Sequence, residues 1–124
     1  MDNNDYNGKK ILIADDNPDI IASLQLMLEG EGFKVESTLE GGKVGKMLQN
    51  HPDLLILDVM MSGHDGRQIC KSIKSHESTR DIPVIMFSAN RNIEESSRKA
   101  GANCFIAKPF EFNDLLQKVE THIN

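Results

Sequence analysis

The sequence predicts one α/β domain of the (βα)5 type, a doubly wound five-stranded parallel sheet with helices on both faces. Three observations support this fold class. The chain has 124 residues, which is enough for one domain with a substantial core but not comfortably for two. Five short segments have strand character, and most are continuous apolar runs typical of a buried strand. Segments with helical apolar spacing separate them, and this alternation is typical of a parallel sheet.

The predicted strands follow these runs in chain order. The first run precedes the turn-forming sequence DDNP, and the third runs directly into Asp58. The fourth follows Pro83 and ends at Ser88, and the fifth ends at Lys108. The five predicted strands are residues 11–14, 34–38, 54–57, 84–87 and 104–107.

Helices are predicted between the strands from apolar periodicity and from residues that stop helices. Ile20, Ile21 and Leu24 begin the first helical pattern, which the glycines at 30 and 32 end. From Phe112, apolar residues recur at i, i+3, i+4, i+7 and i+11, which predicts an amphipathic last helix. A loop connects the third strand to its helix. The predicted helices are residues 20–28, 42–50, 67–75, 93–100 and 112–123.

Composition excludes several classes of protein. Hydrophobic residues make up 39% and charged residues 27%, as in ordinary globular domains. The net charge of −5 argues against nucleic-acid binding through overall charge, because phosphate binding needs a basic face. No apolar stretch is long enough to cross a membrane, and the polar start lacks a signal-peptide core. We therefore expect a cytoplasmic protein with no membrane partner, in which Cys70 and Cys104 are reduced and buried.

Polar side chains follow four of the five predicted strands. The first strand ends on Asp15 and Asp16, the third on Asp58, the fourth on Ser88 and the fifth on Lys108. Ligands of open parallel sheets bind beyond the carboxyl ends of the strands, so we expect these side chains to share one pocket. Clustered carboxylates repel one another unless a cation is present, and hard oxygen ligands suit Mg²⁺.

A carboxylate beside a divalent metal, a lysine and a hydroxyl can attack phosphorus and form an acyl phosphate. Each residue also has a simpler interpretation. Asp15, Asp16 and the following Asn17 could merely start a helix, Ser88 could be a cap, and Lys108 could be a solvated surface charge. Asp58 is harder to explain in this way, because an acid directly after a buried strand needs a partner. The joint pattern favours the phosphoryl chemistry.

The chain resembles the CheY-like receiver domain of bacterial two-component response regulators. The matching stretches are ILIADDNPDI, DLLILDVMMSGHDG, PVIMFSA and FIAKPF, and the match covers essentially the whole chain from Lys10. The resemblance implies a flavodoxin-like architecture, with residues 1–9 as a flexible leader and residues 10–124 as one receiver domain. The family often has proline where this chain has Ser62, so we expect a more mobile loop after Asp58.

The resemblance also implies roles for individual residues. Asp58 matches the phosphoacceptor, and Asp15 and Asp16 match the acidic pair that binds Mg²⁺ together with Asp58 and the backbone carbonyl of Met60. Ser88 and Lys108 match the residues that bind the phosphoryl group, Phe105 matches an aromatic switch, and Pro109 matches a proline that usually follows a cis peptide bond. Ile20 and Phe110 lie where the family's phosphodonor docks.

The favoured hypothesis is a phosphorylation-dependent signalling switch. Asp58 would take a phosphoryl group from a histidine kinase or a histidine phosphotransfer protein. Ser88 and Phe105 would relay the change to the surface of the fourth helix, fifth strand and fifth helix. Such a domain is not an enzyme beyond catalysing its own phosphorylation and dephosphorylation. The alternative is a pseudo-receiver, an interaction module that is never phosphorylated. A phosphatase and a flavin mononucleotide binder are disfavoured, because the first strand lacks their motifs.

Overall fold

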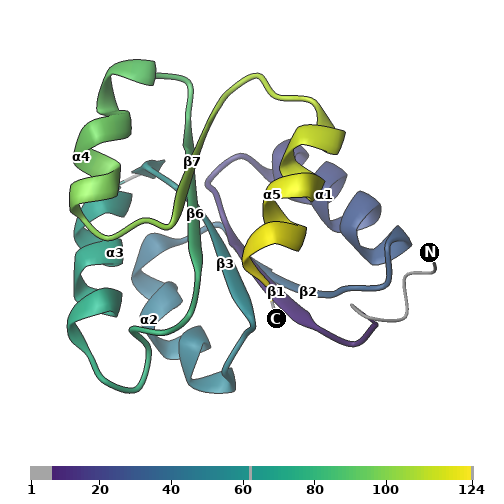
Figure 1. Cartoon of the computed structure of the whole chain (residues 1–124), viewed down its shortest axis with the longest axis horizontal. Coiled ribbons are helices and arrows are strands. Elements are labelled where there is room, and N and C mark those ends of the chain that lie inside the picture. Colours follow the sequence, from purple (N-terminus) through teal and green to yellow (C-terminus); the bar gives the residue numbers. More distant parts are fainter. Residues whose placement is uncertain (1–6, 62, 124) are drawn as a thin grey trace.

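The computed structural model describes residues 7–61 and 63–123 and contains one five-stranded parallel sheet with helices on both faces (Figure 1). The strand order is β2-β1-β3-β6-β7, and all neighbouring pairs are parallel. This confirms the predicted fold class. The strands of the sheet are β1 (Lys10–Ala14), β2 (Lys34–Thr38), β3 (Leu54–Asp58), β6 (Val84–Ser88) and β7 (Cys104–Ala107).

Helices α1 and α5 cover one face of the sheet, and α2, α3 and α4 cover the other (Figure 1). The first helix begins as the sequence indicates, since the Asn17 side chain caps it and Pro18 occupies its first turn. The helices are α1 (Pro18–Gly30), α2 (Val44–Met47), α3 (Gly66–Ser75), α4 (Glu94–Lys99) and α5 (Phe112–His122).

Two of the predicted helices are shorter than expected. The segment predicted as one helix over 42–50 consists of α2 between two 3₁₀ turns, η2 (Gly41–Lys43) and η3 (Leu48–Asn50). Two glycines in this segment, Gly42 and Gly45, weaken helix propagation, and His51 ends it with a left-handed φ of 54°. Likewise α4 starts only after a 3₁₀ turn, η4 (Arg91–Ile93).

The loop predicted after β3 contains a small antiparallel hairpin. Strands β4 (Met60–Met61) and β5 (His64–Asp65) pair with each other in a separate two-stranded sheet. Two-residue strands are too short to show an alternating pattern, so no pattern in the sequence indicates them. The expectation of a mobile turn concerned Ser62, which lies outside the described residues.

Strand alternation divides the core into two apolar layers. Ile13, Ile56 and Phe87 face α1 and α5, whereas their neighbours Leu57 and Met86 face α2, α3 and α4. Both cysteines are free and buried, one in each layer. Burial raises the pKa of the Cys70 thiol to about 11, so this thiol stays protonated and unreactive at neutral pH.

The chain before β1 is only partly described. The expected flexible leader lies largely in residues 1–6, outside the described residues. Nearer the sheet, the Gly8 N–H donates to the Gly32 carbonyl, and the Lys34 N–H donates to the Lys9 carbonyl. Across residues 7–61 and 63–123, no helix combines the length and the apolar character needed to cross a membrane.

Gly66 permits a close backbone approach that holds the end of β3. Its N–H donates to the Val59 carbonyl at 2.7 Å, and a Cβ at this position would lie 2.9 Å from the Val59 Cα and against the Asp58 carbonyl. We expect Gly66→Ala to lower the free energy of unfolding by about 2–4 kcal/mol, because backbone atoms must shift. Gly45→Ala is the matched control, since a Cβ there meets nothing within 4 Å.

Urea unfolding of both variants measures this difference. The control substitution lies within α2, where alanine is the better helix former, so its stability should be unchanged or raised by up to about 1 kcal/mol. Equal stabilities for Gly66→Ala and the wild type would contradict the close approach.

Candidate functional site

The carboxyl ends of three strands bring two acids and a lysine together. Asp58 is the last residue of β3, Asp15 directly follows β1, and Lys108 directly follows β7. In each strand, the residue two positions earlier packs toward α1 and α5. Because side chains alternate between the two faces of a sheet, the side chains of Asp15, Asp58 and Lys108 also lie on that face. Asp15 is fully buried and Asp58 is nearly so. The predicted meeting of these residues at one edge is therefore observed.

Lys108 contacts both acids. Its Nζ donates to Asp15 Oδ2 at 3.1 Å and lies 3.6 Å from Asp58 Oδ1, which is an ion pair beyond good hydrogen-bond length. Backbone N–H groups add two hydrogen bonds. The Asn17 N–H donates to the other Asp15 oxygen, Oδ1, at 2.8 Å, and the Met60 N–H donates to Asp58 Oδ1, the oxygen that faces Lys108, at 3.2 Å. The acids are thus held by fixed donors as well as by the flexible lysine.

Asp16 completes a cluster that fits a magnesium ion. Asp15, Asp16 and Asp58 each offer a carboxylate oxygen, and these oxygens lie within 4.8 Å of one another. Ligands 2.0–2.1 Å from a shared Mg²⁺ span roughly 4 Å, so carboxylates and waters could complete an octahedron with small adjustments. Hard oxygen donors, an excess of negative charge and partial exposure at Asp16 all suit this ion.

The electrostatics of Asp58 show the same need for a cation. Burial and the nearby Asp15 carboxylate raise the pKa of Asp58 to about 6, although Lys108 and the Met60 N–H oppose this rise. Desolvation and a like charge both penalise the ionised form. In the metal-free protein, the charged state of Asp58 is therefore less stable than that of an ordinary aspartate.

Ser88 and Phe105 lie on the opposite face of the sheet. Ser88 ends β6 and is buried, and its Oγ accepts a hydrogen bond from the Asn90 N–H at 3.0 Å. In the β6–β7 register Phe105 pairs with Met86, two residues before Ser88 and on the same face. Phe105 is buried in the layer toward α2, α3 and α4. Ser88 and Phe105 therefore lie on the same face of adjacent strands, away from Asp15, Asp58 and Lys108, which face α1 and α5.

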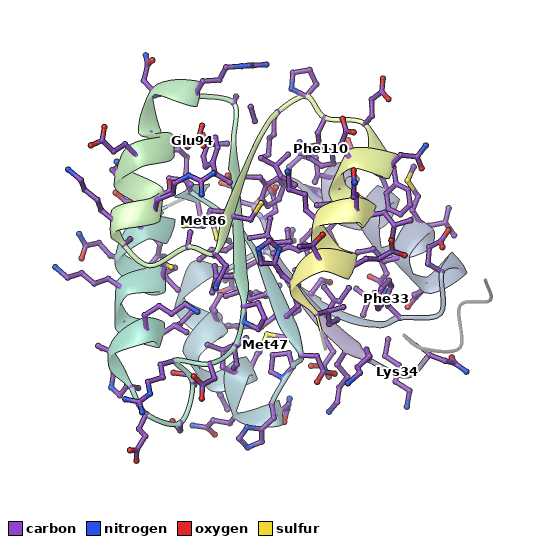
Figure 2. All side chains as sticks on the ribbon, in the orientation of Figure 1. Phe33, Lys34, Met47, Met86, Glu94 and Phe110 are labelled. Atoms are coloured by element: carbon purple, nitrogen blue, oxygen red, sulfur yellow. The ribbon has the colours of Figure 1, made fainter. Side chains whose placement is uncertain are left out.

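Ile20 and Phe110 line one apolar groove between α1 and the start of α5. Phe110 follows the Lys108–Pro109 peptide bond, which is cis. Figure 2 shows Phe110 beside the chain that leads into α5. Both side chains are half-buried against the core, so they present apolar surface beside the acidic cluster. The full lining is Asp19, Ile20, Ser23, Leu24, Met27, Phe110 and Phe112.

Phe87 also belongs to the site, although no sequence pattern indicates it. Its ring lies beneath Lys108, with Nζ 4.4 Å from the ring centroid. A phenylalanine inside the run VIMFS looks like a core residue and nothing more. Its contact with Lys108 depends on which strands are neighbours and on their register, and the local sequence contains no signal for either.

The chain belongs to the response regulator receiver domain family, whose model matches residues 11–120. Among curated relatives, the DNA-binding dual master transcriptional regulator RpaA of Synechocystis is 36% identical over 114 residues. The match covers 89% of this chain and 47% of RpaA. The chain spans about half the length of the first curated relatives it matches.

Solved receiver structures show the same fold. The response regulator TrrA from Thermotoga maritima, in complex with Mg²⁺ and BeF, has a TM-score of 0.85 and 29% identity, and the match covers 93% of this chain and 99% of TrrA. The receiver domain of sensor histidine kinase PA1611 from Pseudomonas aeruginosa has magnesium in its active-site cleft. It matches with a TM-score of 0.85 and 26% identity over 93% of this chain and 97% of that one.

The raised pKa of Asp58 predicts how stability depends on pH without magnesium. The folded protein binds the Asp58 proton more tightly than the unfolded chain, so this residue's contribution falls as pH rises from about 4 to about 6. Asp58→Asn removes the penalised charge. We expect it to raise the free energy of unfolding by about 1–3 kcal/mol at pH 8 and by much less at pH 4.

Urea unfolding in chelator at pH 4 and pH 8 measures both values. Asp114→Asn removes the same formal charge from an exposed position on α5 and is the control. If Asp58→Asn were no more stable than the wild type at pH 8, the proposed destabilisation of the Asp58 charge would be contradicted. Saturating Mg²⁺ should reduce the stability difference between Asp58→Asn and the wild type, because it stabilises the wild type.

Proposed function

We propose that residues 10–124 act as one receiver domain that switches when Asp58 is phosphorylated. A histidine kinase or a histidine phosphotransfer protein supplies the phosphoryl group, and Mg²⁺ is the cofactor. The observation that carries this proposal is the cluster of three carboxylates at the carboxyl edge of the sheet, two of which contact Lys108. Receiver-family membership and the magnesium named in two neighbouring structures support it.

In this mechanism an ionised Asp58 oxygen attacks the phosphorus of the donor. A new P–O bond forms, and the bond from phosphorus to the donor's leaving atom breaks, with its electron pair going to the leaving group. Lys108 keeps its proton and balances charge on the phosphoryl oxygens. A bound Mg²⁺, held by Asp15, Asp16, Asp58 and the Met60 carbonyl, would supply further positive charge for these oxygens.

The signal then passes to the other face of the sheet through Ser88 and Phe105. A phosphoryl group on Asp58 adds acceptor oxygens near the end of β6, where the Ser88 hydroxyl is available as a donor. Movement of Ser88 changes the space beside Phe105, which shares its layer. The affected surface is built from α4, β7 and α5, and its output partner would read that change.

The alternative is a pseudo-receiver that binds partners without phosphorylation. The three acids and the lysine that the proposed phosphorylation would use meet at one edge of the sheet, which favours the switch. Magnesium titration followed by NMR separates the two, because an inert module has no need to bind Mg²⁺ at millimolar concentrations. In either case the domain is a signalling module and not a conventional enzyme.

Asp58→Asn should abolish phosphorylation by acetyl phosphate. Wild type incubated with Mg²⁺ and this donor should gain one phosphoryl group, detected by mass spectrometry of the intact protein and located by peptide mapping. The loss should be complete, since an amide is a poor nucleophile toward phosphorus. Asp114→Asn is the control and should be modified like the wild type, and chelation of Mg²⁺ should suppress modification. An unmodified wild type with bound metal would contradict the switch.

Ile20→Ala should separate docking from chemistry. We expect it to slow transfer from a phosphorylated histidine donor by roughly tenfold, because it removes an apolar contact from the proposed docking groove. Modification by acetyl phosphate needs no docking and should change little. Phe110→Ala is a less suitable test, because the Phe110 ring also contacts Phe87 beneath Lys108. Equal slowing with both donors would contradict docking at Ile20.

A further inference from the structure

The Lys108 ammonium is held by one aromatic ring in addition to its two carboxylates. Its Nζ lies over the ring of Phe87, 4.4 Å from the centroid, while Asp15 Oδ2 is at 3.1 Å and Asp58 Oδ1 at 3.6 Å. The face of an aromatic ring is electron-rich and attracts a cation within about 6 Å, more strongly where water is excluded. Phe87 is fully buried, so its ring is such a surface.

The ring supplies a constraint that the carboxylates cannot. Two distances, to Asp15 and to Asp58, leave the ammonium free to move around the line that joins the two oxygens. Lysine has a long flexible stem with little preference among these positions. A third contact from a fixed direction restricts the ammonium to one region, and Phe87 provides it from below.

The position of the ring is itself tightly fixed. Phe87 pairs with Asp58 in the β3–β6 register, and its carbonyl accepts a hydrogen bond from the Val59 N–H at 3.0 Å. Phe110 contacts it in an edge arrangement, with ring centroids 6.0 Å apart and ring planes at 66°. The ring is therefore held by the sheet on one side and by a second aromatic residue on another.

We propose that Phe87 is a positioning residue, whose ring face holds the Lys108 ammonium where it meets the phosphoryl group entering at Asp58. This inference rests on the proposed phosphorylation of Asp58. Phe87 would affect the rate of that reaction through Lys108, without itself contacting the phosphoryl group.

Ring fluorination at position 87 tests the proposal with little change of volume. Progressive fluorination withdraws electron density from the ring face and so weakens its attraction for a cation. We expect the rate of Asp58 modification by acetyl phosphate, at saturating Mg²⁺, to fall stepwise and to reach about threefold to tenfold for pentafluorophenylalanine. Phe87→Leu should be at least as slow.

Phe33 supplies the matched control. It is a buried phenylalanine of the same apolar layer, and Figure 2 shows it toward the other end of that layer from Phe110. The same fluorinated series and Phe33→Leu should leave the modification rate unchanged, whatever they do to stability. Urea unfolding of every variant shows that the proteins compared are folded. If Phe87 had only a structural role, the modification rate would fall in proportion to the loss of stability. It would then fall in any destabilised variant, including those at position 33.

A second measurement does not depend on phosphorylation. Protons of the Lys108 ε-methylene should show an upfield ring-current shift in NMR spectra, and Phe87→Leu should abolish it while Phe33→Leu preserves it. A missing shift in the wild type, or equal rates across the fluorinated series in a wild type that is phosphorylated, would overturn the positioning role. A wild type that shows the shift but is never modified at Asp58 would instead overturn the proposed function.

Discussion

Repulsion among buried carboxylates at the carboxyl edge of the sheet is the constraint on which this structure depends. Asp15 and Asp58 are held close together beside Asp16, and Lys108 neutralises only part of their charge. The carboxylates repel one another, so their own interactions do not bring them together. The pairing of the surrounding strands holds them in place. β3 and β6 are buried along their whole length, and their backbone pairing fixes where each acid must lie. The burial and pairing of these strands offset the electrostatic repulsion among the acids, and a bound cation can reduce that repulsion.

Strand alternation also places the acidic cluster and the proposed relay residues on opposite faces of the sheet. Asp58, Phe87 and Lys108 project toward α1 and α5, whereas Ser88 and Phe105 project toward α2, α3 and α4. Adjacent residues of β6 therefore serve different layers. In the proposed switch, a change at the acidic cluster would reach the second layer through the end of a single strand, without a long chain of contacts. This arrangement follows directly from the two-residue period of a strand.

Much of the fold and site could be predicted from the sequence, because both depend on strong local patterns. Apolar runs that end in acids or a lysine identify the strands and their functional ends, and parallel topology brings those ends together. The hairpin containing Met60 was missed, because each of its strands has only two residues and shows no pattern of its own. The contact of Phe87 with Lys108 was also missed, because it depends on which strands are neighbours, and that order is absent from local sequence.

The unequal distances around Lys108 indicate how the site could respond to a phosphoryl group. In the unmodified protein the ammonium lies closer to Asp15 than to Asp58, at 3.1 Å against 3.6 Å. A phosphoryl group on Asp58 would carry more negative charge than the carboxylate it modifies, so it would compete with Asp15 for the same ammonium. Phe87 lies beneath this cation and limits how far it can move. The lysine can thus exchange anionic partners through a small displacement while the sheet stays fixed.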